Sequence, residues 1–204
     1  RFVVFGDSLS DPGNFYIAFG QTSEAPFAPI PSAPYSIGGH HFTNGKTWIE
    51  QLTVVLDTPD SGRPALARPG VYTNYAVGGA RARANAPGFP VYDLTSQVSL
   101  YLTDFHGQAQ PDAIYVVWIG GNDLRDALVA LSSDPTGATS QVILGAALQS
   151  VADNVLTLWA TGARKFLIPN LPDLSVAPVI QASGPLVIGA TAQLTGAYNA
   201  GLAQ

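Results

Sequence analysis

Short apolar runs alternate with longer stretches of helical periodicity along this chain. The pattern predicts a buried strand at residues 2–5, because four consecutive apolar residues there are stopped by a glycine. Three further strands are predicted at 71–77, 113–119 and 164–169. The run at 113–119 is the clearest of the four, since seven apolar residues, rich in β-branched and aromatic types, lead directly into a glycine pair.

Apolar residues recur at helical spacing in four segments, 44–57, 92–107, 139–161 and 189–204. Gly107 is expected to cap the second of these helices, and a glycine also follows the third. The side chains predicted to face the core are Trp48, Ile49, Leu52, Val55 and Leu56 in the first helix, Leu94, Val98, Tyr101, Leu102 and Phe105 in the second, and Val142, Leu148, Val151, Val155, Leu158 and Trp159 in the third.

Strands that alternate with helices predict an α/β fold, in which a parallel sheet carries helices on both faces. A helix in such a fold normally leads back to a further strand, yet no strand follows 189–204. The chain is therefore interpreted as a single domain over residues 1–204 that has four strands, lacks a fifth and is incomplete at its C-terminal end.

Composition and charge limit the partners and the chemistry that the chain could have. The chain has 204 residues, 47% of them hydrophobic, and a formal net charge of −5 with only 9 lysines and arginines, so nucleic acid is not an expected partner. The absence of cysteine excludes a disulfide and a thiolate nucleophile, and interrupted apolar stretches predict no membrane span. The absence of methionine, even at the start, is interpreted as loss of a signal peptide, which predicts a secreted or cell-surface protein.

Polar or small residues follow three of the predicted strands directly. Ser8 comes after the first strand, Gly79 after the second and Asn122 after the third. Because the carboxyl ends of parallel strands meet at one edge of a sheet, we expect these residues to converge there. Acyl transfer requires such a set, since a serine attacks while a backbone N–H and an asparagine NH₂ stabilise the developing oxyanion.

Three sequence blocks carry a resemblance to a known family. FGDSLSDPGN, NYAVGGA and GGND resemble, in this order, the first three blocks of the GDSL or SGNH family of serine esterases and lipases, and HFTNGKTWIEQL is similar to a segment of its lipase-like branch. The resemblance extends from residue 2 to at least residue 175. It implies a flavodoxin-like three-layer α/β/α fold, cleavage of a small-molecule or lipid ester through an acyl-serine, and no metal or organic cofactor.

The resemblance also assigns roles to individual residues. It implies that Ser8 is the nucleophile, and that the Ser8 and Gly79 amides form the oxyanion hole together with the side chain of Asn122. Gly78 replaces Gly79 in this role if the alignment shifts by one position.

The chain lacks the sequence block that supplies the catalytic base in this family. The family takes its base from a C-terminal Asp-x-x-His block, whereas none of His40, His41 and His106 has an aspartate three residues before it. A serine without a base is a weak nucleophile. We therefore expect the base in a missing C-terminal segment or a second fragment, and without it this chain alone would be inactive.

Structural roles compete with the catalytic ones. Ser8 could cap a helix instead of attacking an ester, although the ordered blocks favour the nucleophile. His40 and His41 are adjacent, with no carboxylate pattern around them, so a surface loop is favoured over a metal site. Turn-forming, capping or supporting roles are favoured for Asp7, Asp11, Asn14, Asp123 and Asp173.

Two other functions stay open. The chain could bind esters, lipids or glycans without turnover, and continuation past Gln204 into Asp-x-x-His would discriminate this reading from an esterase. It could also be the passenger part of an outer-membrane autotransporter, which downstream barrel strands would reveal. For an active enzyme, the apolar, proline-rich stretch with Phe27, Ile30 and Tyr35 favours an acyl chain or an aryl ester.

Overall fold

A parallel sheet forms the centre of the molecule. The computed structural model describes residues 1–20, 41–43, 45–85 and 92–204. Its strands β1 (Phe2–Gly6), β2 (Ile114–Trp118) and β3 (Lys165–Leu167) are all parallel and lie in the order β1-β2-β3. The predicted α/β class is confirmed, and β3 lies at one edge of the described sheet.

Seven α-helices lie among the described residues. They are α1 (Asn14–Phe19), α3 (Trp48–Val55), α4 (Leu94–Asp104), α5 (Gly121–Ala130), α6 (Ala138–Ala160), α7 (Pro178–Gln181) and α8 (Pro185–Leu202), with short 3₁₀ turns η1 (Pro59–Gly62), η2 (Ala65–Ala67) and η3 (Leu174–Val176). The four predicted helices are confirmed as α3, α4, α6 and α8. Helix α5, which begins inside the GGND block, was not predicted.

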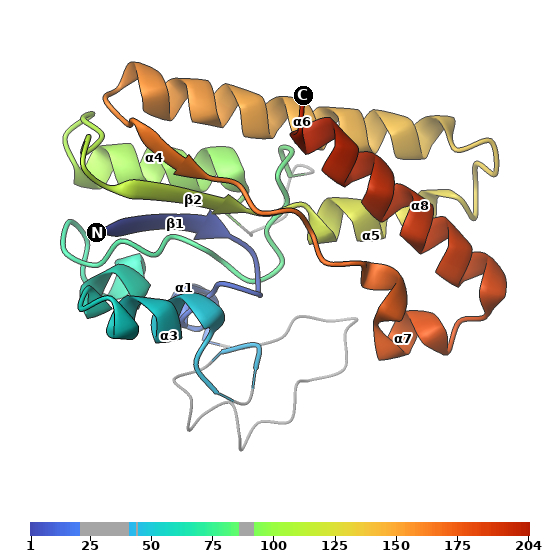
Figure 1. The fold of residues 1–204 in the computed structure, drawn as a ribbon, viewed down its shortest axis with the longest axis horizontal. Helices are drawn as coiled ribbons and strands as arrows, with labels where there is room; N and C mark the ends of the chain where they lie inside the picture. The colour runs from blue at the N-terminus through green and yellow to red at the C-terminus, as the bar shows by residue number, and fades with distance from the viewer. Residues whose placement is uncertain (21–40, 44, 86–91) are drawn as a thin grey trace.

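Helices cover the sheet on both faces, and Figure 1 shows α3 on one side and α4 and α6 on the other. Alternate residues of β1 point to opposite faces, as the pleat of a strand requires. Val3 and Phe5 pack in the cluster that includes Tyr101 of α4, whereas Val4 packs with Ile49 of α3. The core therefore consists of two apolar layers with the sheet between them.

The predicted second strand, 71–77, is not a strand in the structure. It does lie beside β1, where the Val4 N–H donates to the Thr73 carbonyl at 2.9 Å. Further along, the Gln97 side chain of α4 bonds both the N–H and the carbonyl of Gly6, each at 2.9 Å. The Gly6 carbonyl also accepts the Val77 N–H at 3.1 Å, so the segment keeps part of its backbone pairing with β1. Because the Gln97 side chain replaces the backbone acceptor of the Gly6 N–H, the ladder is interrupted, and the described sheet has three strands instead of four.

The buried face of α6 differs from the predicted one. The helix turns Ser140 and Asn154 inward, and the Ser140 hydroxyl donates to the Ala127 carbonyl of α5 at 2.7 Å. These polar residues interrupt the apolar stripe on which the prediction was based. Two α6 side chains predicted to face the core, Val142 and Trp159, are mostly exposed. The same holds for Val55 and Leu56 at the end of α3.

Length and composition alone would allow one helix in the described ranges, α6, to cross a bilayer. Its Leu144, Val151 and Leu158 are buried against the rest of the fold. Helix α6 therefore packs in this structure as an outer layer against α4 and α5.

Candidate active site

Ser8 lies in a tight turn directly after β1. The Ser10 N–H closes this turn by donating to the Asp7 carbonyl at 3.0 Å, and the Leu9 N–H donates to Asp7 Oδ1 at 3.0 Å. The Ser8 side chain is partly exposed, and its hydroxyl has no hydrogen-bond partner in the described part of the chain. Because α1 begins only at Asn14, Ser8 does not cap a helix, and that alternative is wrong.

Asp11 fixes the loop that carries the serine. Its Oδ1 accepts the amides of Gly13 at 2.7 Å and Asn14 at 2.6 Å. Its Oδ2 accepts those of Phe15 at 3.1 Å and Gly78 at 2.7 Å. One buried carboxylate thus joins the first sequence block to the second, and the structural role predicted for Asp11 is confirmed.

Two buried asparagines strengthen the same junction. Asn14 Nδ2 donates to the carbonyl of Asn74 at 2.8 Å, and Asn74 Nδ2 donates to the carbonyl of Ser10 at 2.9 Å. Both side chains are fully buried. The turn around Ser8 is therefore held from the segment that leads to the second block.

The two glycines of the second block differ in what their amides do. The Gly78 N–H is occupied by Asp11, whereas neither the Gly79 N–H nor the Ser8 N–H has an acceptor within the described ranges. Gly79 has φ +79°, in the left-handed region that favours glycine, and it is partly exposed. Gly79 is therefore the better candidate donor for an oxyanion.

Asn122 lies in the first turn of α5 and contacts the second block. Its Nδ2 donates to the Ala80 carbonyl at 2.8 Å, which uses one of the two hydrogens of the amide. On the other side of the block, a Cβ at Gly121 would lie 3.5 Å from Asp7 Oδ2, so the first and third loops are also in contact. The structure thus brings together the three loops that carry Ser8, Gly79 and Asn122.

Tyr198 of α8 supports the third loop, and the sequence analysis missed it. Its ring occupies the space that a side chain at Gly120 would need, and Gly120 has φ +125°. Its hydroxyl donates to the Ile119 carbonyl at 2.9 Å. Nothing in the local sequence distinguishes this tyrosine from other apolar positions of the helix.

Buried carboxyl groups surround the three loops. Burial raises the pKa of Asp7 to about 7, with a smaller contribution from the negative charge of Asp123 and with the Leu9 amide opposing it. Burial also raises the pKa of Asp11 and of Asp123 to about 6, against the backbone amides that bond each group. These groups are therefore partly protonated near neutral pH.

One of the two described histidines does not lie where the sequence analysis expected. His41 is 2% exposed, so its assignment to a surface loop is wrong. Its Nε2 lies 2.7 Å from Glu50 Oε2, a carboxylate nine positions away that the sequence analysis did not pair with it. His106 follows the end of α4, and the nearby Gln110 bonds Arg1 at the amino end of β1, which is the end opposite to Ser8.

Several predicted positions lie outside the described residues. They are His40 and the side chains expected to favour an apolar substrate, Phe27, Ile30 and Tyr35. Within the described ranges, no group of three or more histidines and carboxylates could hold a metal ion. Asp173 caps η3 by accepting the Ser175 N–H at 2.9 Å, which confirms its predicted role.

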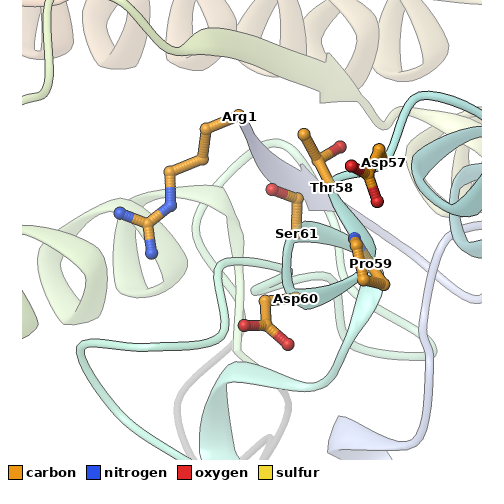
Figure 2. Close-up of a pocket in the computed structure, with 6 residues that line it drawn as sticks. All are labelled: Arg1, Asp57, Thr58, Pro59, Asp60 and Ser61. Carbon is orange, nitrogen blue, oxygen red and sulfur yellow. The ribbon is translucent and has the colours of Figure 1, made fainter.

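A pocket of about 280 Å³ lies away from these loops, at the amino end of β1. Figure 2 shows its lining, which includes Arg1, Asp57 and Asp60. The Arg1 guanidinium is occupied by Gln110 and by the Val71 carbonyl. Five strand residues, roughly 17 Å, separate this pocket from the turn at Ser8, so it is not part of the candidate site.

Comparisons with known proteins agree on one kind of relative. The model of the GDSL-like lipase/acylhydrolase family matches residues 2–204. The chain is 30% identical to Lipase 1 of Photorhabdus luminescens over 87% of its own length and 23% of that protein. It is 28% identical to the phosphatidylcholine-sterol acyltransferase of Aeromonas hydrophila over 98% of its own length and 52% of that protein.

A third relative carries a contrasting name. The chain is 24% identical to inactive GDSL esterase/lipase-like protein 25 of Arabidopsis thaliana, over 89% of its own length and 44% of that protein. The chain thus spans between about a quarter and about half of the length of these relatives.

Proposed function

Because the chain belongs to the GDSL-like lipase/acylhydrolase family, we propose that it is the part of a serine hydrolase that cleaves carboxylic esters through an acyl-Ser8 intermediate. The observation that best supports this proposal is that the loop of Ser8, whose hydroxyl and N–H have no partner among the described residues, contacts the loops that carry Gly79 and Asn122 at the carboxyl edge of the sheet. The substrate is a lipid or small-molecule ester.

The nucleophile is Ser8. Its Oγ attacks the ester carbonyl carbon and passes its proton to a base, which then protonates the departing alcohol. Water attacks the acyl-serine in the second half of the reaction, releases the carboxylic acid and restores the hydroxyl. The support for Ser8 is its position in a turn closed by Asp7, with a partly exposed hydroxyl that bonds no described residue.

The oxyanion donors are the Ser8 N–H, the Gly79 N–H and the second hydrogen of Asn122 Nδ2. A donor aimed at the tetrahedral intermediate accelerates the reaction only if it is fixed before the reaction begins. The bond from Asn122 to the Ala80 carbonyl supports this role, because it orients the amide next to Gly79.

The base is a histidine outside this chain. The sequence has no Asp-x-x-His block, and the described histidines have other environments, since His41 is paired with Glu50 and His106 lies beyond the opposite end of the sheet. We infer a single hydrolase domain over 1–204 that is completed by a further segment. Export after cleavage of a signal peptide stays a prediction, which fractionation of the producing cells would test.

The competing candidate is a protein that binds an ester, lipid or glycan without turnover. The name of one relative, which is itself called inactive, favours it. The two candidates differ in whether the full-length gene product hydrolyses an ester.

Hydrolysis of p-nitrophenyl butyrate by the full-length gene product tests the proposal. Ser8→Ala should lower turnover on the order of 10⁴-fold or more, because the nucleophile is lost. Ser133→Ala is the matched control, since the side chain of this exposed serine bonds only the Ala130 carbonyl among the described residues, and it should leave turnover unchanged. Full turnover by Ser8→Ala would overturn the assignment, and a wild-type protein that binds the ester without hydrolysing it would establish the competing candidate.

A further inference from the structure

One carboxylate on α5 receives two arginines from the segment that follows Gly79. Asp126 accepts Arg81 through two bonds, Nε to Oδ2 at 2.5 Å and Nη2 to Oδ1 at 3.1 Å. Asp126 Oδ2 also accepts Arg83 Nη2 at 2.5 Å. The bidentate pair has a fixed geometry as well as a favourable charge, because the planar guanidinium matches the two carboxylate oxygens.

The same face of α5 binds the backbone of this segment. Asn122, Asp123 and Asp126 are spaced so that all three lie on one side of the helix. Asp123 Oδ2 accepts the Ala82 N–H at 2.7 Å, and Asn122 binds the Ala80 carbonyl. The first turns of α5 therefore hold residues 80–83 both by backbone bonds, at Ala80 and Ala82, and by ion pairs, at Arg81 and Arg83.

Burial distinguishes this cluster from an ordinary surface ion pair. The side chains of Arg81 and Asp126 are 11% and 21% exposed, and that of Asp123 is fully buried. The pair between Arg63 and Asp60 has exposed fractions of 55% and 57% and a separation of 3.8 Å. Ion pairs that are shielded from water are screened less by salt and hold their partners more firmly.

We propose that Asp126 is a positioning residue for ester hydrolysis, which sets the Gly79 amide against the Asn122 side chain through Arg81 and Arg83. This inference rests on the proposed function. Asp126 does not touch the substrate; it connects the helix that carries one oxyanion donor to the segment that carries another. Sequence analysis assigned no role to any of the three charged residues.

A positioning role for Asp126 predicts different effects on kcat and on KM. Oxyanion donors act mainly on the tetrahedral state, so a loosened pair should lower kcat and leave KM nearly unchanged. Asp126→Asn keeps the size of the side chain and removes its charge. We expect kcat to fall about 10- to 100-fold, because misplacement by about 1 Å is enough for such a loss. Asp60→Asn, the matched control on an exposed ion pair, should leave both constants unchanged.

A double-mutant cycle with Asn122→Ala distinguishes positioning from general loosening of the fold. If Asp126 acts through the two donors, its replacement should lower kcat less than about 3-fold once the Asn122 amide is gone, because coupled residues are not additive. A trifluoromethyl ketone, which forms a reversible tetrahedral adduct with a serine, should bind Asp126→Asn more weakly by the same factor as kcat falls. These measurements use the full-length gene product.

Each outcome is decisive. An unchanged kcat in Asp126→Asn, or an equal loss with and without Asn122, overturns the positioning role while leaving the proposed function intact. Full activity of Ser8→Ala overturns the proposed function itself. If Asp126→Asn fails to fold, Arg83→Gln removes one of the three bonds to Asp126, together with the 3.4 Å ion pair between Arg83 and Asp123, and leaves the bidentate pair of Arg81 in place. It should give a smaller loss of kcat, about 3- to 10-fold, with the same dependence on Asn122.

Discussion

The two ends of the parallel sheet use charged side chains in different ways. At the carboxyl end, Asp7, Asp11 and Asp123 are buried, and each accepts backbone amides from the loops around Ser8. At the amino end, Asp60 pairs with Arg63 on an exposed surface, beside an open pocket. The difference indicates that the carboxyl-end loops are held in one arrangement, as a site for acyl transfer requires, whereas the amino end tolerates change.

Removal of one carboxylate from each end should show the largest contrast. Asp11→Ala leaves four buried backbone amides without an acceptor, so the free energy of unfolding should fall by about 3–4 kcal/mol. Asp60→Ala should cause no measurable change, because its ion pair is exposed to water. Urea denaturation of both variants measures the two values, and equal losses would remove the proposed difference between the ends.

The pH dependence of stability sharpens the contrast. The pKa of Asp7 is about 7 in the fold, above its usual value of 3.8, so the folded state holds a proton that the unfolded state releases between these values. The free energy of unfolding should therefore decrease as the pH rises from about 4 to about 7. The total decrease should be about 1.4 kcal/mol for each unit by which the folded and unfolded pKa values of Asp7 differ. Asp11 and Asp123 act in the same direction.

Asp7→Asn isolates this contribution. The amide oxygen can still accept the Leu9 N–H but cannot titrate, so the variant should lose stability less steeply over the same pH range. Thermal unfolding at several pH values provides the measurement. A wild-type stability that increases between pH 4 and pH 7 would contradict the burial of these carboxyl groups.

The smallest effect is expected at the support of the third loop. Tyr198→Phe keeps the ring against Gly120 and removes only the bond to the Ile119 carbonyl. The free energy of unfolding should fall by about 1 kcal/mol. Chemical denaturation tests this value, and Tyr72→Phe, which removes an exposed bond from Arg63, serves as the comparison.

The sequence predicted what depends on local pattern and missed what depends on side chains from distant elements. Strand β2 and helices α3, α4, α6 and α8 follow from apolar runs and helical spacing. The segment at 71–77 has the composition of a strand, yet Gln97 of α4 replaces part of its backbone pairing. No pattern within the segment could indicate this.

The residues of the candidate site also fall into those that local sequence predicts and those that it does not. Ser8, Gly79 and Asn122 could be placed from the turns that end three strands, because parallel strands bring those turns to one edge. Asp126 and Tyr198 could not, since their roles depend on which face of α5 and α8 meets the loops. The pair of buried His41 and partly buried Glu50 was missed for a similar reason, because the local sequence around both residues is typical of polar surface positions.

Covalent labelling of the full-length gene product tests the central claim most directly. The protein would be treated with a serine-directed phosphonate, and the modified residue would be located by peptide mass mapping while hydrolysis of p-nitrophenyl butyrate is followed. The structure at the carboxyl edge predicts one adduct, on Ser8, that forms in step with the loss of hydrolysis. An adduct on another serine, or hydrolysis that persists after Ser8 is fully modified, would contradict it.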